Sequence, residues 1–303
     1  EGDLLEVAAL ALPALDVGRR RHWRTAFLAC AAKRRLLCAR MSVPARTSDR
    51  FRDAQVSHFT EADEAQFRWT TAAPGIAEAE DELLAPLVPL LRSPCLEVGC
   101  GEGNNLARLT RGLRCVGVDL FPRKLAFARC ELAGTHFAAA DAVHLPFRDG
   151  AFPSVFVRDL LHHVPEPERA LAEAVRVLAP GGTLCLLEPN GRNPLIRLQT
   201  HLVPAEVGAR ESGFAALRAM LARQPLDELE IAARQPLALR RMLLHYRFGL
   251  PALGRLAPAA ALLAGLERAL GALLPRSRWT YVVATAIRRE EAGRQAAARQ
   301  EAG

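Results

Sequence analysis

The sequence predicts an α/β fold in which a ligand binds at the carboxyl ends of strands. Three observations lead to this prediction. The segment LEVGCGEGNNL, residues 96–106, places three glycines between a strand-like and a helix-like run. The apolar run CVGVD, residues 115–119, ends in an acid, and the later runs SVFVRD and GGTLCLLEP read as further strands. A glycine turn at a strand's carboxyl end is typical of Rossmann-like folds.

The glycine turn is the first candidate binding element. Glycine tolerates positive φ and carries no Cβ, so Gly99, Gly101 and Gly103 let the backbone approach a ligand closely. Asp119 ends the next predicted strand, where a carboxylate can accept both hydroxyls of a ribose. Together these residues predict a nucleoside-containing cofactor, with a plain tight turn as the competing interpretation.

The spacing of the loop favours one cofactor over another. A dinucleotide fingerprint has its third glycine one position later, whereas this loop reads GxGxG. Glu97 precedes the loop and would repel a pyrophosphate but attract an ammonium or sulfonium group. We therefore expect S-adenosylmethionine, with its carboxylate near the start of a helix from Asn105, and disfavour a nicotinamide-dependent oxidoreductase.

Four blocks in sequence order resemble the class I S-adenosylmethionine-dependent methyltransferases, especially the ubiquinone and menaquinone biosynthesis subgroup. The blocks are EVGCGEGN, GVDLFPRKLAFAR, AADAVHLPFRDGAF and VRDLLHHVPEPERALAEAVRVLAPGGTLCLLEPN, within residues 83–190. The resemblance implies a Rossmann-like seven-stranded sheet with helices on both faces, its first five strands parallel and its last antiparallel. One departure is Pro153 after Phe152, where the family usually has an acid; we expect this proline at the first position of its strand.

The resemblance also implies roles for individual residues. The residues that would line the methionine part of the cofactor are Glu97, Gly99, Gly101 and Gly103. Cys100 lies inside the loop, and we expect its side chain to fill space at the binding site as a small apolar group. Asp119 would hold the ribose, with Leu120 or Phe121 against the adenine face and Asp141 and Ala142 at its amino edge. Arg158 would begin the loop that faces the reacting centre, and so is both a cofactor-binding and a catalytic candidate.

Two histidines are the remaining catalytic candidates. His162 and His163 follow the predicted fourth strand, beside the expected point of methyl transfer. Imidazole titrates near neutral pH, so either ring can take a proton from an acceptor; packing at a helix start is the competing interpretation. The sequence does not distinguish the two histidines. Methyl transfer asks mainly for alignment and exclusion of water, so the sequence indicates the reaction better than the acceptor.

The organisation along the chain is expected to be as follows: a basic arm at 1–50, a helical cap at 51–82, a methyltransferase core at 83–234 and 279–290, a helical insertion at 235–278 and a tail at 291–303. The arm resembles an arginine-rich transit peptide or a solvated segment, and Met41 is an alternative start. In the cap, Pro74 and Gly75 are expected to break the pattern before a helix from Glu78 to Leu91. The candidate lid residues are His58, Phe67 and Trp69.

Segments outside the shared blocks are expected to set specificity. Asn190, Arg192 and Asn193 are candidate acceptor contacts, with ordinary turn chemistry as the alternative, and Ser212 is a candidate helix cap. The insertion carries an apolar stripe, Leu262, Leu266, Leu270 and Leu273, beside four arginines, Arg240, Arg241, Arg247 and Arg255. Its uninterrupted apolar stretch between Arg255 and Glu267 is too short to cross a bilayer. The insertion therefore either lies at a membrane surface, encloses an apolar acceptor, or forms a helical pair folded on the sheet or a dimer surface.

Composition narrows the functional classes further. The 303 residues carry a net charge of +7, largely from arginine, but no stacking aromatics interleave with the basic patches, so a nucleic-acid partner is disfavoured. Seven cysteines without metal-ligand spacing indicate reduced thiols and no metal site. We therefore expect a cytoplasmic or membrane-peripheral methyltransferase acting on a small-molecule or lipid-like acceptor. The alternative from another class is a catalytically inactive cofactor-binding interaction subunit; the oligomeric state stays open.

Overall fold

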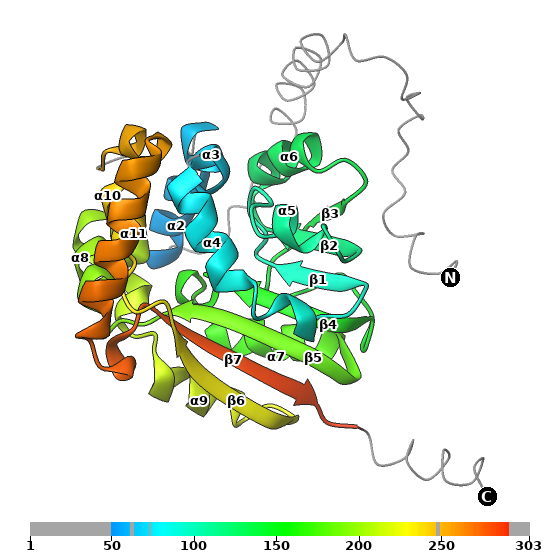
Figure 1. The fold of residues 1–303 in the computed structure, drawn as a ribbon. Coiled ribbons are helices and arrows are strands. Elements are labelled where there is room, and N and C mark those ends of the chain that lie inside the picture. Colours follow the sequence, from blue (N-terminus) through cyan, green and yellow to red (C-terminus); the bar gives the residue numbers. More distant parts are fainter. Residues whose placement is uncertain (1–49, 61–63, 73, 247–248, 291–303) are drawn as a thin grey trace, which may run out of the picture.

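The structure is a computed structural model that describes residues 50–60, 64–72, 74–246 and 249–290. The expectations for the basic arm before Arg50, for Met41 and for the tail at 291–303 lie outside the described residues, as does Arg247. Within the described part, helices surround one central sheet (Figure 1).

The sheet has seven strands in the order β3-β2-β1-β4-β5-β7-β6. The strands are β1 Cys95–Val98, β2 Cys115–Asp119, β3 His136–Ala139, β4 Phe152–Arg158, β5 Leu178–Pro189, β6 Leu226–Arg234 and β7 Tyr281–Arg288. β1 to β5 pair in parallel, and β7 lies antiparallel between β5 and β6. The expected Rossmann-like sheet, mostly parallel with an antiparallel last strand, is confirmed.

Alternating side chains of the central strands form two apolar clusters, one on each face. Val155 and Val157 point to one cluster, and Phe156 between them points to the other. The first face is covered by α7 (Pro167–Val177) and α9 (Phe214–Leu221), the second by α4 (Pro74–Leu84), α5 (Leu106–Leu109) and α6 (Pro122–Glu131). Strands buried on both faces explain why β1, β2 and β4 read as nearly continuous apolar runs.

Several local boundaries differ from expectation. Pro74 and Gly75 open α4 instead of preceding it, because proline suits the first turn of a helix; α4 ends at Leu84, and a separate 3₁₀ turn, η1 (Val88–Leu90), follows. Pro153 is the second residue of β4 and sits at a shift in the pairing register, where its missing donor breaks no regular ladder. The position before α9 is Gly213, which makes no side-chain cap, so Ser212 is not the cap.

The remaining helices gather beyond the carboxyl ends of the parallel strands (Figure 1). They are α2 (Arg50–Thr60), α3 (Glu64–Ala72), η2 (Leu161–His163), α8 (Pro194–Leu202), η3 (Pro204–Arg210), α10 (Leu239–Leu243), η4 (Pro251–Arg255), α11 (Ala257–Ala272) and η5 (Arg276–Arg278). Within residues 235–278, α10 and α11 pack on each other and on α4. Among the described helices, none combines the length and apolar character that crossing a bilayer requires.

Candidate functional site

A cavity of about 290 Å³ opens at the carboxyl ends of β1, β2 and β4. Its walls also include residues of α2, α3, η2, η3 and the segment after α10. Helices that are distant in the sequence therefore cover the cavity at the carboxyl ends of the strands. Most of the predicted site residues line it: Gly99, Cys100, Gly101, Asp119, Leu120, Phe121, Asp141, Ala142, Arg158, His162 and His163. Of the predicted set, Glu97 and Gly103 are not among the described lining residues.

The three loop glycines all adopt positive φ, at +78°, +53° and +84° for Gly99, Gly101 and Gly103. A Cβ on Gly99 would lie 2.8 Å from Leu160, and one on Gly103 would lie 2.9 Å from Leu132. These two glycines therefore let the loop fit against its neighbours. Gly101 has more room and lines the cavity itself.

Asp119 ties the glycine loop to the end of β2. Its Oδ2 accepts a hydrogen bond from the Gly101 amide at 2.8 Å, and its Oδ1 accepts one from the Phe121 amide at 2.9 Å. Each carboxylate oxygen has a further lone pair, and Asp119 lines the cavity. The arrangement fits an acid that holds two neighbouring hydroxyls of a ribose.

Glu97 lies directly behind the cavity wall and is fully buried. Its Oε1 accepts a hydrogen bond from Asn105 Nδ2 at 2.6 Å, whereas its Oε2 has no hydrogen-bond partner among the described residues. Burial raises the pKa of Glu97 to about 8 despite the hydrogen bond from Asn105. A buried carboxylate oxygen without a donor fits a site for a ligand cation such as an ammonium group.

Arg158 is held by several neighbours at the cavity wall, including Asp159 at 3.3 Å. Its guanidinium makes a 2.5 Å ion pair with Glu80, with both side chains 3% exposed, and donates to Asn105 Oδ1 at 2.9 Å. Arg241 contacts the other Glu80 oxygen at 2.8 Å. Burial by itself would raise the pKa of Glu80, but Arg158 and Arg241 outweigh it and lower the pKa to about 2. Arg158 thus links the Glu80 pair to the Asn105–Glu97 pair.

The two histidines of η2 differ in charge because their neighbours differ. His162 Nδ1 lies 2.7 Å from Glu188 and its Nε2 lies 3.4 Å from Glu206; burial would lower its pKa, but the two acids raise it to about 10. Burial and the charge of His162 lower the pKa of His163 to about 3. At neutral pH His162 is therefore charged and His163 neutral.

Gln55 of α2 orients the neutral ring of His163. Its Nε2 donates to the carbonyl oxygen of Ala205 at 2.6 Å, which leaves its Oε1 facing His163 Nδ1 at 3.0 Å. His163 Nδ1 then carries the proton, because an amide oxygen only accepts. The lone pair of the ring is on Nε2, on the side of Glu206.

Several of the candidate lid and acceptor-contact residues do not line the cavity. Trp69 and His58 line the cavity, but Phe67 does not and packs against Phe127 at a ring distance of 5.2 Å. The amide groups of Asn190 and Asn193 are fully buried and donate to carbonyl oxygens of residues 277–279. Their hydrogen bonds match the turn-chemistry interpretation, and exposed Arg192 does not line the cavity either.

Five site residues were not predicted from the sequence: Gln55, Glu80, Asn105 as a partner of Glu97, Glu188 and Glu206. Glu188 had a usable signal, because an acid near the end of β5 falls at the same sheet edge as Asp119. Gln55, Glu80 and Glu206 had none, since α2, α4 and η3 reach the site only through tertiary packing.

Comparisons with known proteins agree with the fold and the loop. Residues 96–186 match the family described as "Methyltransferase domain". The phthiotriol/phenolphthiotriol dimycocerosates methyltransferase of Mycobacterium leprae is 37% identical over 143 residues, which cover 46% of this chain and 47% of that protein. The demethylmenaquinone methyltransferase of Thermus thermophilus is 41% identical over 100 residues, covering 31% and 46%. The chain thus spans about half the length of these curated relatives.

Among solved structures, the phosphoethanolamine N-methyltransferase 2 of Haemonchus contortus in complex with S-adenosyl-L-methionine superposes with a TM-score of 0.58. It is 19% identical, and the match covers 81% of this chain and 61% of that one, which supports the fold alone. The matching domain family, the strand order and the glycine loop agree with one another. The chain carries a class I S-adenosylmethionine-dependent methyltransferase domain, whose cofactor is S-adenosylmethionine.

Proposed function

We propose that this protein transfers a methyl group from S-adenosylmethionine to a small, lipid-like acceptor. The observation that carries the proposal is one cavity whose lining includes both the glycine loop and aromatic side chains of the helical cap. We assign the cofactor to the end beside the Gly101–Asp119 loop, with Glu97 behind it, and the acceptor to the end beside His163, Trp69 and Tyr246. A charged cofactor and an apolar acceptor suit these two ends.

The proposed cofactor contacts follow from the buried polar groups. Glu97 Oε2 would receive the ammonium group and Asp119 the ribose hydroxyls, with the backbone of Gly99, Cys100 and Gly101 between them. The remaining proposed contacts are Gly103, Leu120, Phe121, Asp141, Ala142 and Arg158. When bound, S-adenosylmethionine supplies a methyl group already activated by its positively charged sulfur.

The proton of a hydroxyl or amine acceptor would be received on the η2 side of the cavity. His162 is already charged, so it cannot serve as the base and instead positions Glu206. His163 Nε2 and the Glu206 carboxylate both carry lone pairs there. Arg158 acts as a positioning residue, since its guanidinium is engaged by Glu80 and Asn105.

Apolar lining and the relatives' names support a lipid-like acceptor. Trp69, Ile196, Val203 and Tyr246 line the cavity outside the glycine loop, and the ring of Phe59 lies between those of His163 and Phe121. The names of two relatives refer to phthiotriol dimycocerosates and to demethylmenaquinone. Both support an apolar acceptor with a reactive group at one end.

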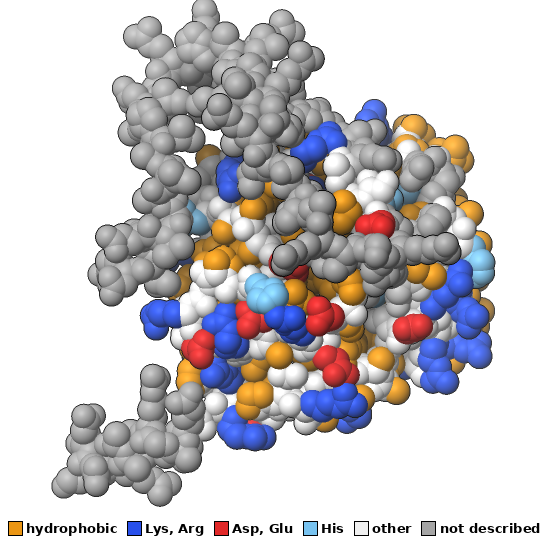
Figure 2. Space-filling view, turned by 180° about the vertical axis from the view of Figure 1, so that it is seen from behind, with side chains coloured by type: hydrophobic (Ala, Val, Ile, Leu, Met, Phe, Trp, Pro, Cys, Tyr) orange, Lys and Arg blue, Asp and Glu red, His pale blue; other side chains and the backbone are white. Residues whose placement is uncertain are grey.

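Contact with a membrane surface belongs to the same proposal. Residues 249–278 expose seven leucines, Leu250, Leu253, Leu256, Leu262, Leu266, Leu270 and Leu273. Exposed arginines, among them Arg255, Arg268 and Arg276, accompany them, and the sole acid of this segment, Glu267, is buried. An apolar surface with positive charge suits anionic lipids. Elsewhere, on the face shown in Figure 2, acidic side chains lie among basic ones.

One of the predicted head-group contacts is wrong. Arg240 is 2% exposed and pairs with Glu267 at 3.2 Å and Glu82 at 2.8 Å. The buried acid holds it inside the packing of α10, α11 and α4, so it cannot reach a lipid surface.

Vesicle binding tests the membrane contact. Leu262→Ser/Leu266→Ser/Leu270→Ser should weaken binding to anionic phosphatidylglycerol vesicles at least about tenfold in sedimentation, because it removes much of the apolar area. Leu198→Ser/Leu202→Ser is the matched control, since these leucines of α8 are similarly exposed. Equal binding by both variants and the parent would remove the membrane contact from the proposal.

Label transfer tests the reaction itself. The protein is incubated with S-adenosylmethionine labelled in its methyl group and with separated lipid and water-soluble extract fractions. We expect label in an apolar product, and loss of the label with Asp119→Ala. Calorimetric titration with S-adenosylmethionine and NAD separates the alternatives: tight cofactor binding with no product in any fraction favours an interaction subunit, and preference for NAD overturns the assignment.

A further inference from the structure

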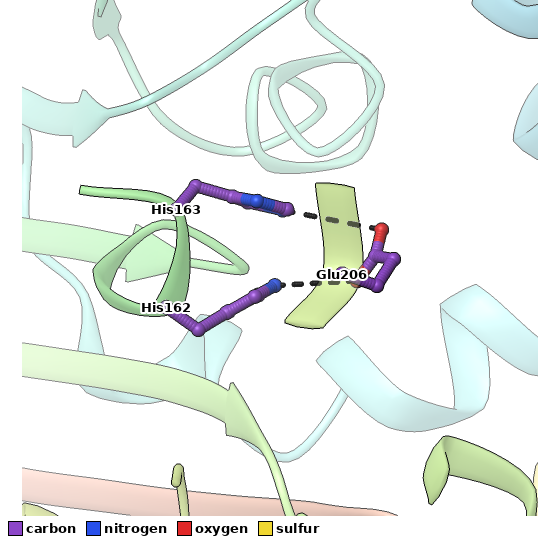
Figure 3. A group of neighbouring side chains, drawn as sticks. All are labelled: His162, His163 and Glu206. Atoms are coloured by element: carbon purple, nitrogen blue, oxygen red, sulfur yellow. Dashed lines mark ion pairs between the residues drawn. The ribbon is translucent and has the colours of Figure 1, made fainter. Parts of the chain in front are cut away.

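Three side chains at the floor of the acceptor end point toward one another. They are His162 and His163 of η2 and Glu206 of η3 (Figure 3). His162 Nε2 lies 3.4 Å from Glu206 Oε2, and His163 Nε2 lies 4.0 Å from Glu206 Oε1. One ligand-type atom from each residue lies within 4.8 Å of the others. Imidazole nitrogen and carboxylate oxygen are ligands that divalent transition metals share.

The outer contacts of both rings direct Nε2 into the cluster. His162 Nδ1 is held by Glu188 at 2.7 Å, and His163 Nδ1 by Gln55 Oε1 at 3.0 Å. A carboxylate or carbonyl acceptor on the far nitrogen is the usual support of a metal-bound histidine, because it fixes the ring and its tautomer. Both supports are therefore already present in this structure.

His162 Nε2 gives an independent indication of a ligand. The His162 side chain is 2% exposed, and its Nε2 has no hydrogen-bond partner within the described part of the chain. A buried polar atom without a partner is rare and calls for an explanation, such as an ion at that place. The nearest acceptor, a Glu206 oxygen at 3.4 Å, is too far for a good hydrogen bond with favourable geometry.

The distances suit an ion between the three groups. In a tetrahedral site with bonds of about 2.1 Å, neighbouring ligand atoms lie about 3.4 Å apart. The separation of His162 Nε2 from Glu206 Oε2 already has this value. The other separations in the cluster, which are within 4.8 Å, would need to shorten by at most about 1.4 Å through side-chain rotation. Metal binding would displace the proton that His162 carries in the metal-free protein, and the divalent ion would then balance Glu188 and Glu206 between two neutral imidazoles.

We propose that His162, His163 and Glu206 bind one divalent transition-metal ion of the zinc type, with a fourth position open to the acceptor end of the cavity. All three residues line that cavity. Two histidines, one glutamate and an open position form a known type of catalytic zinc site. The inference rests on the proposed function only for its purpose: an ion there would bind the acceptor oxygen and favour loss of its proton to the second Glu206 oxygen.

Cobalt titration tests the site on the full chain. Protein treated with a chelator is titrated with Co²⁺, and its visible absorption is recorded, with Zn²⁺ added afterwards as a competitor. We expect one Co²⁺ per chain with a visible band, displaced by Zn²⁺. Glu206→Gln and His163→Asn should weaken binding at least a hundredfold, and Gln55→Leu, which removes a supporting acceptor, about tenfold.

His201→Asn is the matched control, since His201 is an exposed histidine of α8 whose Nδ1 contacts the Arg197 carbonyl at 2.7 Å. It should leave the Co²⁺ band and the affinity unchanged. Circular dichroism checks that each variant is folded. X-ray absorption of the Co²⁺-loaded parent should show two imidazoles and oxygen, a readout that does not depend on any variant.

Three results would overturn the inference: no Co²⁺ band in the parent, sulfur ligation in the absorption spectrum, or equal affinity in Glu206→Gln and His201→Asn. Calorimetry with S-adenosylmethionine on the metal-free protein keeps the two proposals apart. Metal binding without cofactor binding would remove the proposed function and leave the metal site. Cofactor binding and methyl transfer without metal binding would remove the metal site and leave the proposed function.

Discussion

Glu97→Gln is the most direct test of how the cofactor cation is held. Glu97 is fully buried, its Oε2 has no partner among the described residues, and its pKa is about 8. About nine-tenths of the Glu97 side chains are then protonated at pH 7 in the ligand-free protein. An ammonium group beside Oε2 would stabilise the carboxylate, so cofactor binding at pH 7 should release close to one proton.

The proton count is measured by isothermal titration calorimetry in phosphate and in Tris, which differ in ionisation enthalpy. The parent should release about 0.9 proton on binding at pH 7, and its affinity should fall about tenfold per pH unit below pH 8. Glu97→Gln keeps an acceptor for Asn105 but offers no charge to the ammonium group. It should bind at least about a hundredfold more weakly and release no proton.

Stability gives a second readout with a definite sign. The folded-state pKa of Glu97, about 8, lies above its ordinary value of 4.5, so folding favours the protonated form. The ligand-free parent should therefore lose stability relative to Glu97→Gln as the pH rises from 4.5 through 8, by roughly 4–5 kcal/mol in full. Urea unfolding at pH 6 and pH 9 should show roughly 3 kcal/mol of this loss, because the part between pH 4.5 and pH 6 has already occurred at the lower pH.

Glu168→Gln is the control for both readouts, because this exposed glutamate pairs with Arg223 on the surface. It should match the parent in proton release and in pH dependence. If the parent and Glu97→Gln release the same number of protons and bind equally well, Glu97 does not face the cofactor cation, and the reasoning from its orphan oxygen fails.

Three further predictions concern the same region. Gly208→Ala would place a Cβ against the carbonyl oxygen of His162, so we expect a loss of several kcal/mol in urea unfolding; a change below 1 kcal/mol would contradict the packing of η3 on η2. Glu80→Gln leaves Arg158 without its buried partner and should lower the free energy of unfolding by roughly 3–5 kcal/mol above pH 4.5. The difference from the parent should shrink as the pH falls through about 2, and a difference that is constant with pH would contradict this pair. Asp119→Asn should weaken cofactor binding about 10- to 100-fold in calorimetry, with unchanged affinity as the contrary result.

Much of the core was predictable because its determinants are local. β2 has the bounds of the predicted run CVGVD, since an apolar run between turn residues specifies a buried strand. Helix ends were less predictable. A proline can either begin a helix or interrupt a helical pattern. Only the packing of α4 on the sheet and on α11 shows that Pro74 begins a helix here.

The two histidines show the limit of sequence reasoning. His162 and His163 are neighbours with the same intrinsic pKa, yet one is charged and the other neutral. At His162, Glu188, which lies 26 residues along the chain, and Glu206 outweigh burial, whereas burial and the charge of His162 dominate at His163. Electrostatic environment depends on which distant side chains are brought within a few ångströms.

By itself, the sequence determined the glycine loop, the acid at the end of β2 and the strands that carry them, because glycine conformations and strand propensities act over a few residues. Tertiary structure alone decided that Glu97 lies behind the cavity wall, that Glu80 neutralises Arg158, and that Glu206 faces both histidines. Those relations depend on how α4, η2 and η3 pack, and burial and Coulomb interactions at such contacts set the charge of each group.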